Sequence, residues 1–331
     1  MEKKEPTIFS NLRVDSWDNF VGQGKVKKAL KVALSAAKKR HEPVEHILLY
    51  GPPGLGKTSL AHLIAKELNV NIRASSGPAL ERAGDLASIL TNLNQGDIFF
   101  IDEIHRLPKV VEETLYPAME DYHLDIIVGQ GPSARTLKLD LPKFTLIGAT
   151  TRIGLIAAPL RDRFGIVHRL TFYEPQDLMQ ILKNASNKLK INLDSAAAES
   201  LARRARGTPR IALKLLKRCR DLAQIQGKSG INRPVLDESL SLLEVDEMGL
   251  DANDRRLLSA LIDKYQGGPV GLETLAAIIS EDKDTIEEVI EPYLLQIGFL
   301  KRTPRGRFAT AKAYAHFNKK LPLAFTQQQL V

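Results

Sequence analysis

The sequence predicts an α/β fold in which helices cover both faces of a parallel sheet, followed by an all-helical domain and a winged-helix domain. Three observations predict it. Short apolar runs alternate with helical patterns up to about residue 173, whereas only helical patterns follow from residue 174. From about residue 250, helices precede a basic two-stranded segment. We therefore expect domains over residues 1–173, 174–249 and 250–331.

The first region alternates strand and helix, which favours parallel strands joined by helical crossovers. Apolar runs predict strands at 46–50, 71–75, 97–102 and 144–150, and helical spacing of apolar residues covers 25–40 and 57–68. The stretch 124–141 reads as two short strands around a Gly-Gln-Gly-Pro-Ser turn. This pattern predicts a hairpin that projects from the sheet layer.

The remaining chain is predicted to be mostly helical. The second domain shows helical patterns at 174–189, 194–205, 209–226 and 234–243, and the third shows them at 252–265, 271–279 and 282–297. The segment "GFLKRTPRGRFAT" then places Gly and Pro at its centre and β-forming residues on each side. Three helices followed by a basic two-stranded wing outline a winged helix-turn-helix.

The composition is that of a soluble protein, and we expect a cytoplasmic one. No apolar run approaches the roughly 18 residues that span a bilayer, and the first residues, "MEKKEPTIFSNL", lack the apolar core of a secretory signal. Cys219 is the only cysteine, which excludes an intrachain disulfide and a multi-cysteine metal site. Its helical surroundings predict a small packed residue.

The charge is unevenly distributed. The net charge is +8, and residues 301–320 contain seven Lys or Arg without any Asp or Glu. Residues 273–291 instead carry seven acids and one lysine. We expect these runs on opposite faces of the third domain, so that the basic face meets a phosphate backbone.

Residues 51–58, "GPPGLGKT", match the phosphate-binding pattern G-x-x-x-x-G-K-T between a predicted strand and a predicted helix. The glycines let backbone N–H groups turn toward phosphates, and the helix N-terminus adds a favourable dipole. Lys57 is then expected to reach the β- and γ-phosphates, and the Thr58 hydroxyl to hold Mg²⁺.

The run "IFFIDE" (98–103) supplies the complementary carboxylates. Asp102 would meet the metal at the carboxyl edge of the sheet, and Glu103 would orient the attacking water, which favours hydrolysis over transfer to a small molecule. His105 is expected to be a structural or coupling residue. In "GATTR" (148–152), either Thr151 or Thr150 would contact the γ-phosphate or the water.

Two further arginines are candidates for stabilising the negative charge that develops on the γ-phosphate during hydrolysis. Arg210 begins a helix of the second domain and would link that domain to the nucleotide state. Arg163 lies in "PLRDRFG", which we expect on the opposite edge of the first domain from the chain's own site. We therefore predict that Arg163 serves the neighbouring subunit's nucleotide in a head-to-tail ring. The alternative is a structural surface cluster of Arg161, Asp162 and Arg163.

These motifs together resemble the AAA+ ATPases, and more closely the RuvB family of Holliday-junction branch-migration motors, over about residues 8–320. The resemblance is carried by "GPPGLGKTSLA", "IDEIHRL", "LDIIVGQGPSARTLKLDLP", "FTLIGATTRIGLIAAPLRDRFGI" and "RTPRGR". It implies an ATP/ADP- and Mg²⁺-dependent homohexameric ring on double-stranded DNA. It also implies a junction-binding partner of the RuvA type, docked through a hairpin at 124–139, and a resolvase of the RuvC type in the wider complex.

The resemblance also implies roles for single residues. Arg163 matches an arginine finger, Thr151 a first sensor and Arg210 a second sensor, whereas Arg302 and Arg307 match DNA-phosphate contacts. The remaining implied nucleotide neighbours are Leu12, Arg13, Gly54, Gly56, Lys57, Thr58, Ser59, Glu120, Asp121, Tyr122 and Tyr173.

Two other functional classes fit parts of the pattern. A nucleotide-gated initiator or loader would use ATP as a switch, but the pairing of Glu103 with Arg163 favours turnover. A DNA-binding regulator with a vestigial ATPase would not keep Lys57, Thr58, Asp102 and Glu103 together. Aromatic residues make up only 6% of the chain, which disfavours an RNA partner.

Overall fold

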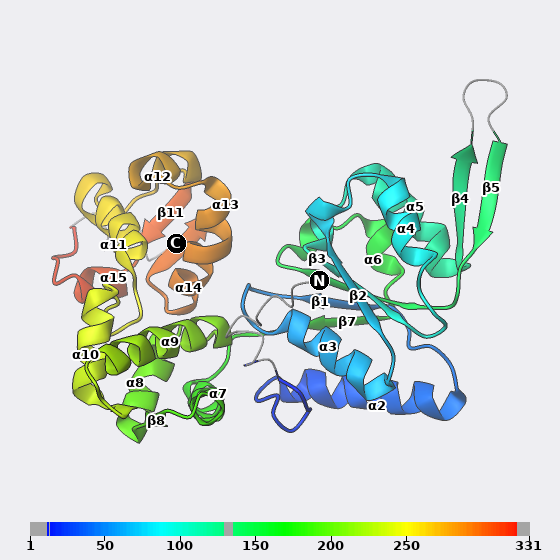
Figure 1. The fold of residues 1–331 in the computed structure, drawn as a ribbon. Helices are drawn as coiled ribbons and strands as arrows, with labels where there is room; N and C mark the ends of the chain where they lie inside the picture. Colours follow the sequence, from blue (N-terminus) through cyan, green and yellow to red (C-terminus); the bar gives the residue numbers. More distant parts are fainter. Residues whose placement is uncertain (1–11, 13, 129–134, 323–331) are drawn as a thin grey trace. The chain divides into compact units, whose positions relative to one another are not determined.

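The computed structural model describes residue 12, residues 14–128 and residues 135–322. The chain divides into two compact units, residues 1–177 and 178–331, and Figure 1 shows the elements of each. Within the described residues, no helix is both long and apolar enough to cross a membrane. The expected boundary between residues 249 and 250 stays a prediction.

The first unit is built on a five-stranded parallel sheet in the order β2-β3-β6-β1-β7. The strands are β1 (Ile47–Tyr50), β2 (Ile72–Ser76), β3 (Ile98–Asp102), β6 (Thr145–Thr150) and β7 (Ile166–Arg169). The four predicted strands are confirmed. β7 was not predicted because its sequence, "IVHR", places two polar residues in a short edge strand.

Helices cover both faces of this sheet (Figure 1). α2 (Gly24–Arg40) and α3 (Lys57–Leu68) lie on one side, and α4 (Ala83–Leu90), α5 (Lys109–Glu120) and α6 (Ala158–Asp162) lie on the other. Alternate strand residues face the two layers, so Leu48, Phe99, Ile101 and Leu146 join the core beneath α4, α5 and α6. Short 3₁₀ turns are η1 (Gly77–Ala79), η2 (Ile104–Arg106) and η4 (Ile153–Leu155).

The predicted hairpin is present and extends away from the sheet (Figure 1). β4 (His123–Val128) pairs antiparallel with β5 (Arg135–Asp140), in a register that joins His123 to Asp140 and Val128 to Arg135. The predicted Gly-Gln-Gly-Pro-Ser turn lies outside the described residues. Leu137 on β5 is half exposed, at 51% of its surface.

The second unit begins within α7 and contains the predicted helices of the second domain. These are α7 (Pro175–Lys188), α8 (Ser195–Arg204), α9 (Pro209–Ile225) and α10 (Arg233–Leu242). The expectation that strands end at residue 174 is wrong in one detail. A two-residue parallel pair joins β8 (Asn192–Leu193) to β9 (Gly230–Ile231), too short to give an apolar run in the sequence.

The same unit ends in the predicted helices and wing. α11 (Ala252–Ser259) continues into a π-helical turn, η5 (Ala260–Lys264), and is followed by α12 (Leu272–Ile279). α13 (Lys283–Thr285), the π-turn η6 (Ile286–Ile290) and α14 (Glu291–Gln296) form one run. β10 (Leu300–Thr303) and β11 (Gly306–Ala309) form the antiparallel wing, and α15 (Ala311–His316) follows.

The expectation that the acidic and basic runs lie on opposite faces is wrong. Arg302 and Arg307 are directly opposite each other on the wing, where two like charges repel. The Glu287 carboxylate lies 3.3 Å from Arg302 and 3.2 Å from Arg307, and Arg307 also pairs with the buried Glu291. Part of the acidic run therefore neutralises the two arginines that lie next to the turn of the wing.

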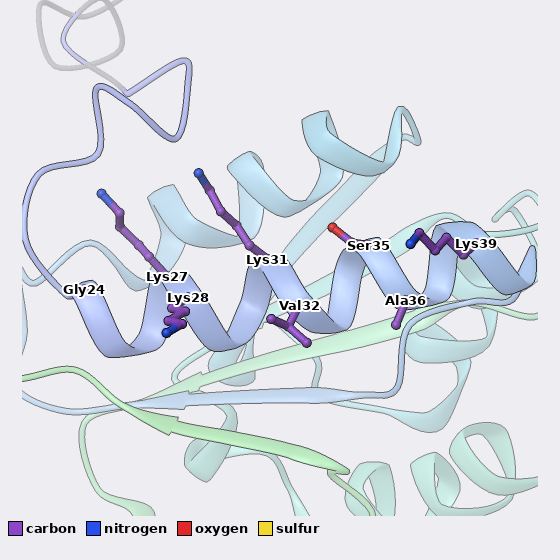
Figure 2. A pocket seen from close by; sticks show the side chains of 8 residues that line it. All are labelled: Gly24, Lys27, Lys28, Lys31, Val32, Ser35, Ala36 and Lys39. Carbon is purple, nitrogen blue, oxygen red and sulfur yellow. The ribbon is translucent and has the colours of Figure 1, made fainter.

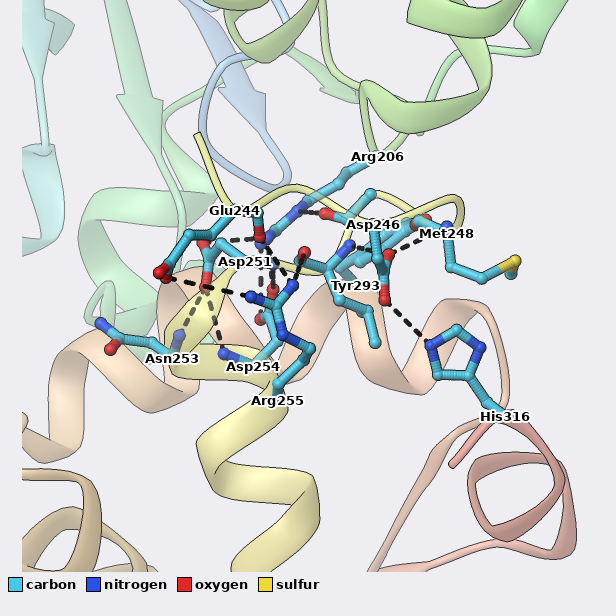
Figure 3. Close-up of polar contacts among 12 residues, drawn as sticks. Arg206, Glu244, Asp246, Met248, Asp251, Asn253, Asp254, Arg255, Tyr293 and His316 are labelled. Atoms are coloured by element: carbon cyan, nitrogen blue, oxygen red, sulfur yellow. Dashed lines mark hydrogen bonds and ion pairs between the residues drawn. The ribbon is translucent and has the colours of Figure 1, made fainter. Parts of the chain in front are cut away.

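A buried ionic cluster joins the helical part of the second unit to α11 (Figure 3). The Arg206 guanidinium donates to the Gly249 carbonyl at 2.7 Å, lies 2.9 Å from Asp251 and pairs with the fully buried Asp254. It also lies over the Tyr293 ring, 5.4 Å from its centroid. Burial raises the pKa of Asp254 to about 7, and Arg206 opposes that rise.

Replacing Arg206 with Met is expected to destabilise this unit by up to about 3–5 kcal/mol, because the buried Asp254 would lose its guanidinium partner and would have to take up a proton or stay as an unpaired charge. Hydrogen exchange of the α8 and α11 amides measures the loss. Arg203→Met is the matched control, since Arg203 pairs with Glu199 at the surface and such pairs contribute about 0–1 kcal/mol. Equal exchange in the two variants would contradict the prediction.

Candidate nucleotide-binding site

The predicted phosphate loop connects β1 to α3. Gly51 and Gly56 adopt positive φ values of 140° and 99°, which side chains rarely tolerate. A Cβ on Gly51 would lie 2.4 Å from the Leu170 carbonyl oxygen, so the loop has no room for a larger residue. The turn leaves the first N–H groups of α3 without helical partners, which suits phosphate oxygens.

Lys57 begins α3 and is buried, with 7% of its surface exposed. Its ammonium donates to the Gly51 carbonyl at 2.8 Å and to the Pro52 carbonyl at 3.0 Å. The charge therefore lies over the loop that the sequence predicts to hold phosphates. Thr58 and Ser59 follow in the first turn of α3, both partly buried.

Two carboxylates follow β3 at the same edge of the sheet. Asp102 is the last residue of β3, and its Oδ1 accepts the Glu103 N–H at 3.0 Å. Glu103 has a left-handed backbone conformation with φ 50°, which turns the chain sharply into η2. Because β1, β3 and β6 are parallel, their carboxyl ends bring Lys57, Asp102, Glu103 and Thr151 to one edge.

The donors at this edge suit a hard divalent cation. A Thr hydroxyl and an Asp carboxylate are oxygen ligands of the kind that Mg²⁺ prefers, and Mg²⁺ completes its coordination with phosphates and water. Thr58 and Asp102 are the residues that would hold it. The described residues contain no group of three or more His, Cys, Asp or Glu side chains able to hold a metal by themselves.

The two threonines at the end of β6 have different surroundings. Thr150 is fully buried, and its hydroxyl lies 2.9 Å from Nδ1 of His105 and accepts the Arg152 N–H at 2.9 Å. Thr151 is partly exposed. This favours Thr151 as the residue that meets a γ-phosphate, with Thr150 behind it.

Arg163 lies at the other end of the strands. It precedes β7, whose first residue, Ile166, pairs in register with Ile47, the first residue of β1. The phosphate loop follows the last residue of β1. The expectation of an opposite edge is therefore corrected to an opposite end, since β7 is the direct neighbour of β1.

Arg163 is held there by side chains of α5. Its guanidinium lies 3.0 Å from Glu120, 4.4 Å from the centroid of the Tyr116 ring, and donates to the Pro159 carbonyl at 2.6 Å. Burial and the bond to Glu112 raise the pKa of Tyr116 to about 12. Tyr116 was not predicted, although its spacing of four residues from Glu120 places both on one helical face.

Three family models of known proteins match successive parts of the chain. The family model described as the Holliday junction DNA helicase RuvB P-loop domain matches residues 12–170. The RuvB AAA lid domain matches 173–246, and the RuvB C-terminal winged helix domain matches 247–318. The chain belongs to the RuvB family. The expected fold class, an AAA+ ATPase domain followed by lid and winged-helix domains, is thereby confirmed.

Solved structures of RuvB are similar over nearly the whole chain. The Thermotoga maritima RuvB Holliday junction branch migration motor is 51% identical with a TM-score of 0.87, covering 94% of this chain and 100% of that one. A point mutant of the same Thermotoga protein gives 51% identity and a TM-score of 0.87, covering 94% and 99%.

The structure describes two of the three residues expected to surround the adenine and its nearby phosphates, Leu12 and Tyr173. The Tyr173 hydroxyl donates to the Leu55 carbonyl at 3.1 Å, and burial raises its pKa above the usual range. The Gln23 amide ties the segment before Tyr173 to α2 by donating to the Thr171 carbonyl at 2.7 Å. Leu12 is buried, and Arg13 lies outside the described residues.

Three predicted residues lie in the second unit. Arg210 is exposed and is the second residue of α9. Arg302 has 58% of its side chain exposed, whereas Arg307 has 10% exposed. A phosphate contact by Arg307 would require its pair with Glu291 to open, so Arg302 is the readier contact.

A separate basic depression of about 640 Å³ lies along α2 (Figure 2). All its lining residues come from that one helix: Gly24, Lys27, Lys28, Lys31, Val32, Ser35, Ala36 and Lys39. It includes none of the predicted nucleotide-site residues.

His46 positions the backbone next to Glu120. Its Nδ1 accepts the Leu146 N–H at 2.9 Å and its Nε2 lies 2.9 Å from the Met119 carbonyl, so Nε2 carries the proton. Burial lowers the pKa of His46. Protonation would replace the Nδ1 acceptor with a donor facing another donor.

We expect protonation of His46 to destabilise the first unit below pH 6.5. The folded pKa lies below the unfolded one, so the unfolded chain binds the extra proton first and stability falls as pH falls. Relative to His46→Gln, the wild type should lose up to about 1.4 kcal/mol per pH unit below 6.5. Urea unfolding followed by fluorescence of Trp17, the chain's only tryptophan, measures this difference. A difference that stays constant from pH 7.5 to 5.5 would refute it.

Proposed function

We propose that this chain is an ATP-driven motor that moves Holliday junctions by translocating double-stranded DNA, and that it works as a homohexameric ring. Membership of the RuvB family and likeness to the Thermotoga branch migration motor support the motor activity. The ring, its partners and its cytoplasmic location are the finer parts of the proposal, as is a division into domains at 1–173, 174–249 and 250–331.

One observation supports the ring above all others. Lys57, Asp102, Glu103 and Thr151 lie at the carboxyl ends of parallel strands, and Arg163 lies with Glu120 at the amino ends. Each chain thus presents two different half-sites that cannot meet within the chain. Head-to-tail contact between copies joins them, and a closed rotation yields a ring.

Within such a composite site each residue has a distinct task. Lys57 and the backbone of Gly54 and Gly56 would bind the phosphates. Thr58 and Asp102 would hold Mg²⁺, which would neutralise the negative charge that develops on the phosphate oxygens. Glu103 would orient the attacking water, and Thr151 would contact the γ-phosphate. Arg163 of the neighbouring copy would stabilise the phosphoryl group during its transfer. Arg210 would couple the position of the lid domain, residues 173–246, to the nucleotide state.

The other proposed partners use other surfaces. The hairpin at 124–139 would dock a junction-binding protein of the RuvA type, and Leu137 on β5 is half exposed there. A resolvase of the RuvC type would join the wider complex. Duplex DNA would meet the wing, where Lys301, Arg302 and Arg305 are exposed.

The test of the ring mixes two inactive variants. Lys57→Ala and Arg163→Ala should each lose ATPase activity, the latter by roughly 10³–10⁵-fold. An equal mixture should recover about a quarter of the wild-type rate, because one interface in four then pairs an intact Lys57 with an intact Arg163. DNA-stimulated phosphate release and migration of a four-way junction are the measurements.

A matched control mixes Lys57→Ala with Glu103→Gln. Both residues lie in the same half-site, so no interface becomes intact and no activity should return. If the first mixture recovers no ATPase activity at any ratio, the shared site is ruled out. If DNA does not change the ATPase rate of the wild type, the motor is ruled out.

The wing should bind phosphates without reading sequence. Arg302→Ala is expected to weaken duplex binding at low salt and to reduce the slope of log affinity against log salt by about 1. Fluorescence anisotropy over a salt series measures it. Arg233→Ala, which removes an exposed arginine of α10 paired with Asp237, should leave the slope unchanged. Equal slopes in all three proteins would contradict the assignment.

A further inference from the structure

A chain of polar contacts runs behind the candidate catalytic edge. The Arg152 N–H donates to the Thr150 hydroxyl at 2.9 Å, and this hydroxyl lies 2.9 Å from Nδ1 of His105. Nε2 of the same imidazole lies 3.4 Å from the Glu103 carboxylate. The His105 side chain is 2% exposed, so its ring nitrogens are shielded from water and bond within the protein.

The partners determine which ring nitrogen carries the proton. An ionised carboxylate only accepts, and it lies 3.4 Å from Nε2, so the contact favours the tautomer that carries the proton on Nε2. In the neutral ring Nδ1 is then an acceptor, and the Thr150 hydroxyl must donate to it. That hydroxyl keeps a lone pair for the Arg152 N–H. The contacts therefore have one direction, from the backbone N–H of Arg152 through Thr150 and His105 to Glu103.

We propose that His105 is a positioning residue for Glu103, which it links through Thr150 to the backbone that follows the predicted γ-phosphate contact, Thr151. The inference rests on the proposed role of Glu103 in hydrolysis and adds the residues that orient it. The 152 amide belongs to the peptide bond between Thr151 and Arg152. A shift of that peptide bond changes the bond to Thr150 and, through the imidazole, the direction of the Glu103 carboxylate.

The surroundings favour a positioning role over simple packing. The Glu103 side chain is 32% exposed and its backbone is left-handed, so its carboxylate faces solvent in part. His105 is the buried and immobilised member of the pair. Through His105, the end of β6 thus restrains the Glu103 carboxylate, which must point toward the attacking water to act on it.

Two substitutions at His105 separate its two contacts. Asn keeps a polar atom near Nδ1 for Thr150 but is too short to reach Glu103, and Gln places its amide near Nε2. His105→Asn should lower kcat for ATP by roughly 10- to 100-fold with KM and ADP affinity unchanged within about twofold. His105→Gln should restore part of kcat, by at least about threefold over Asn.

Substitutions at Thr150 test the other end. Thr150→Val removes the hydroxyl at constant shape and should lower kcat like His105→Asn, whereas Thr150→Ser should stay within about threefold of wild type. The double variant Thr150→Val/His105→Asn should be no slower than the slower single variant, because both break one chain of contacts. The ¹⁵N shifts of His105 should show the Nε2–H tautomer.

The controls distinguish the possible failures. His41→Asn, at an exposed helix end, should match the wild type in rate and melting temperature. A wild type that does not hydrolyse ATP, or a fully active Glu103→Gln variant, would overturn the proposed function and this inference with it. If those two behave as expected, the inference alone fails on any of three results: wild-type kcat in His105→Asn, a loss explained by unfolding in thermal melts, or a dominant Nδ1–H tautomer.

Discussion

The direction of the parallel strands β6, β1 and β7 decides which side chains of one chain can share a site. The phosphate loop follows the carboxyl end of β1, and Arg163 precedes the amino end of β7, which pairs with β1 in register. A four-residue strand spans about 13 Å, and sliding β7 by one residue would break its pairing and turn the partly buried Ile166 and His168 outward. The arginine and the loop are therefore parts of different sites unless a second copy brings them together.

Two of the arginines expected to meet phosphates differ in how readily they can leave their internal partners. Arg163 pairs with Glu120, whose side chain is 55% exposed, and such a pair contributes about 0–1 kcal/mol. Arg307 pairs with Glu291, whose side chain is 2% exposed, and opening a buried pair costs about 3–5 kcal/mol. Arg163 can thus exchange one anion for another at small cost, whereas Arg307 acts first as support for the wing.

Much of the fold and the chemical half of the site were predictable from the sequence. "GPPGLGKT" and "IFFIDE" are local patterns in which strand, turn and functional side chain are consecutive, so Lys57, Thr58, Asp102 and Glu103 could be placed together. The contacts of Arg163 with Tyr116 and of Arg302 and Arg307 with Glu287 depend on packing between distant segments, which periodicity does not encode. The edge strand β7 and the pair β8–β9 were missed because strands this short are stabilised by neighbours and not by their own apolar pattern.

The central strand β6 connects the two half-sites through a buried histidine at each end. At its amino end, His46 accepts the Leu146 N–H and contacts the Met119 carbonyl, one residue before Glu120. At its carboxyl end, Thr150 meets His105 and, through it, Glu103. β6 is paired on both sides within the sheet, with β3 and with β1. A displacement of β6 against β1 would therefore alter the backbone beside Glu120 and the contact to Glu103 together, so the surroundings of Arg163 and of Glu103 depend on the same strand.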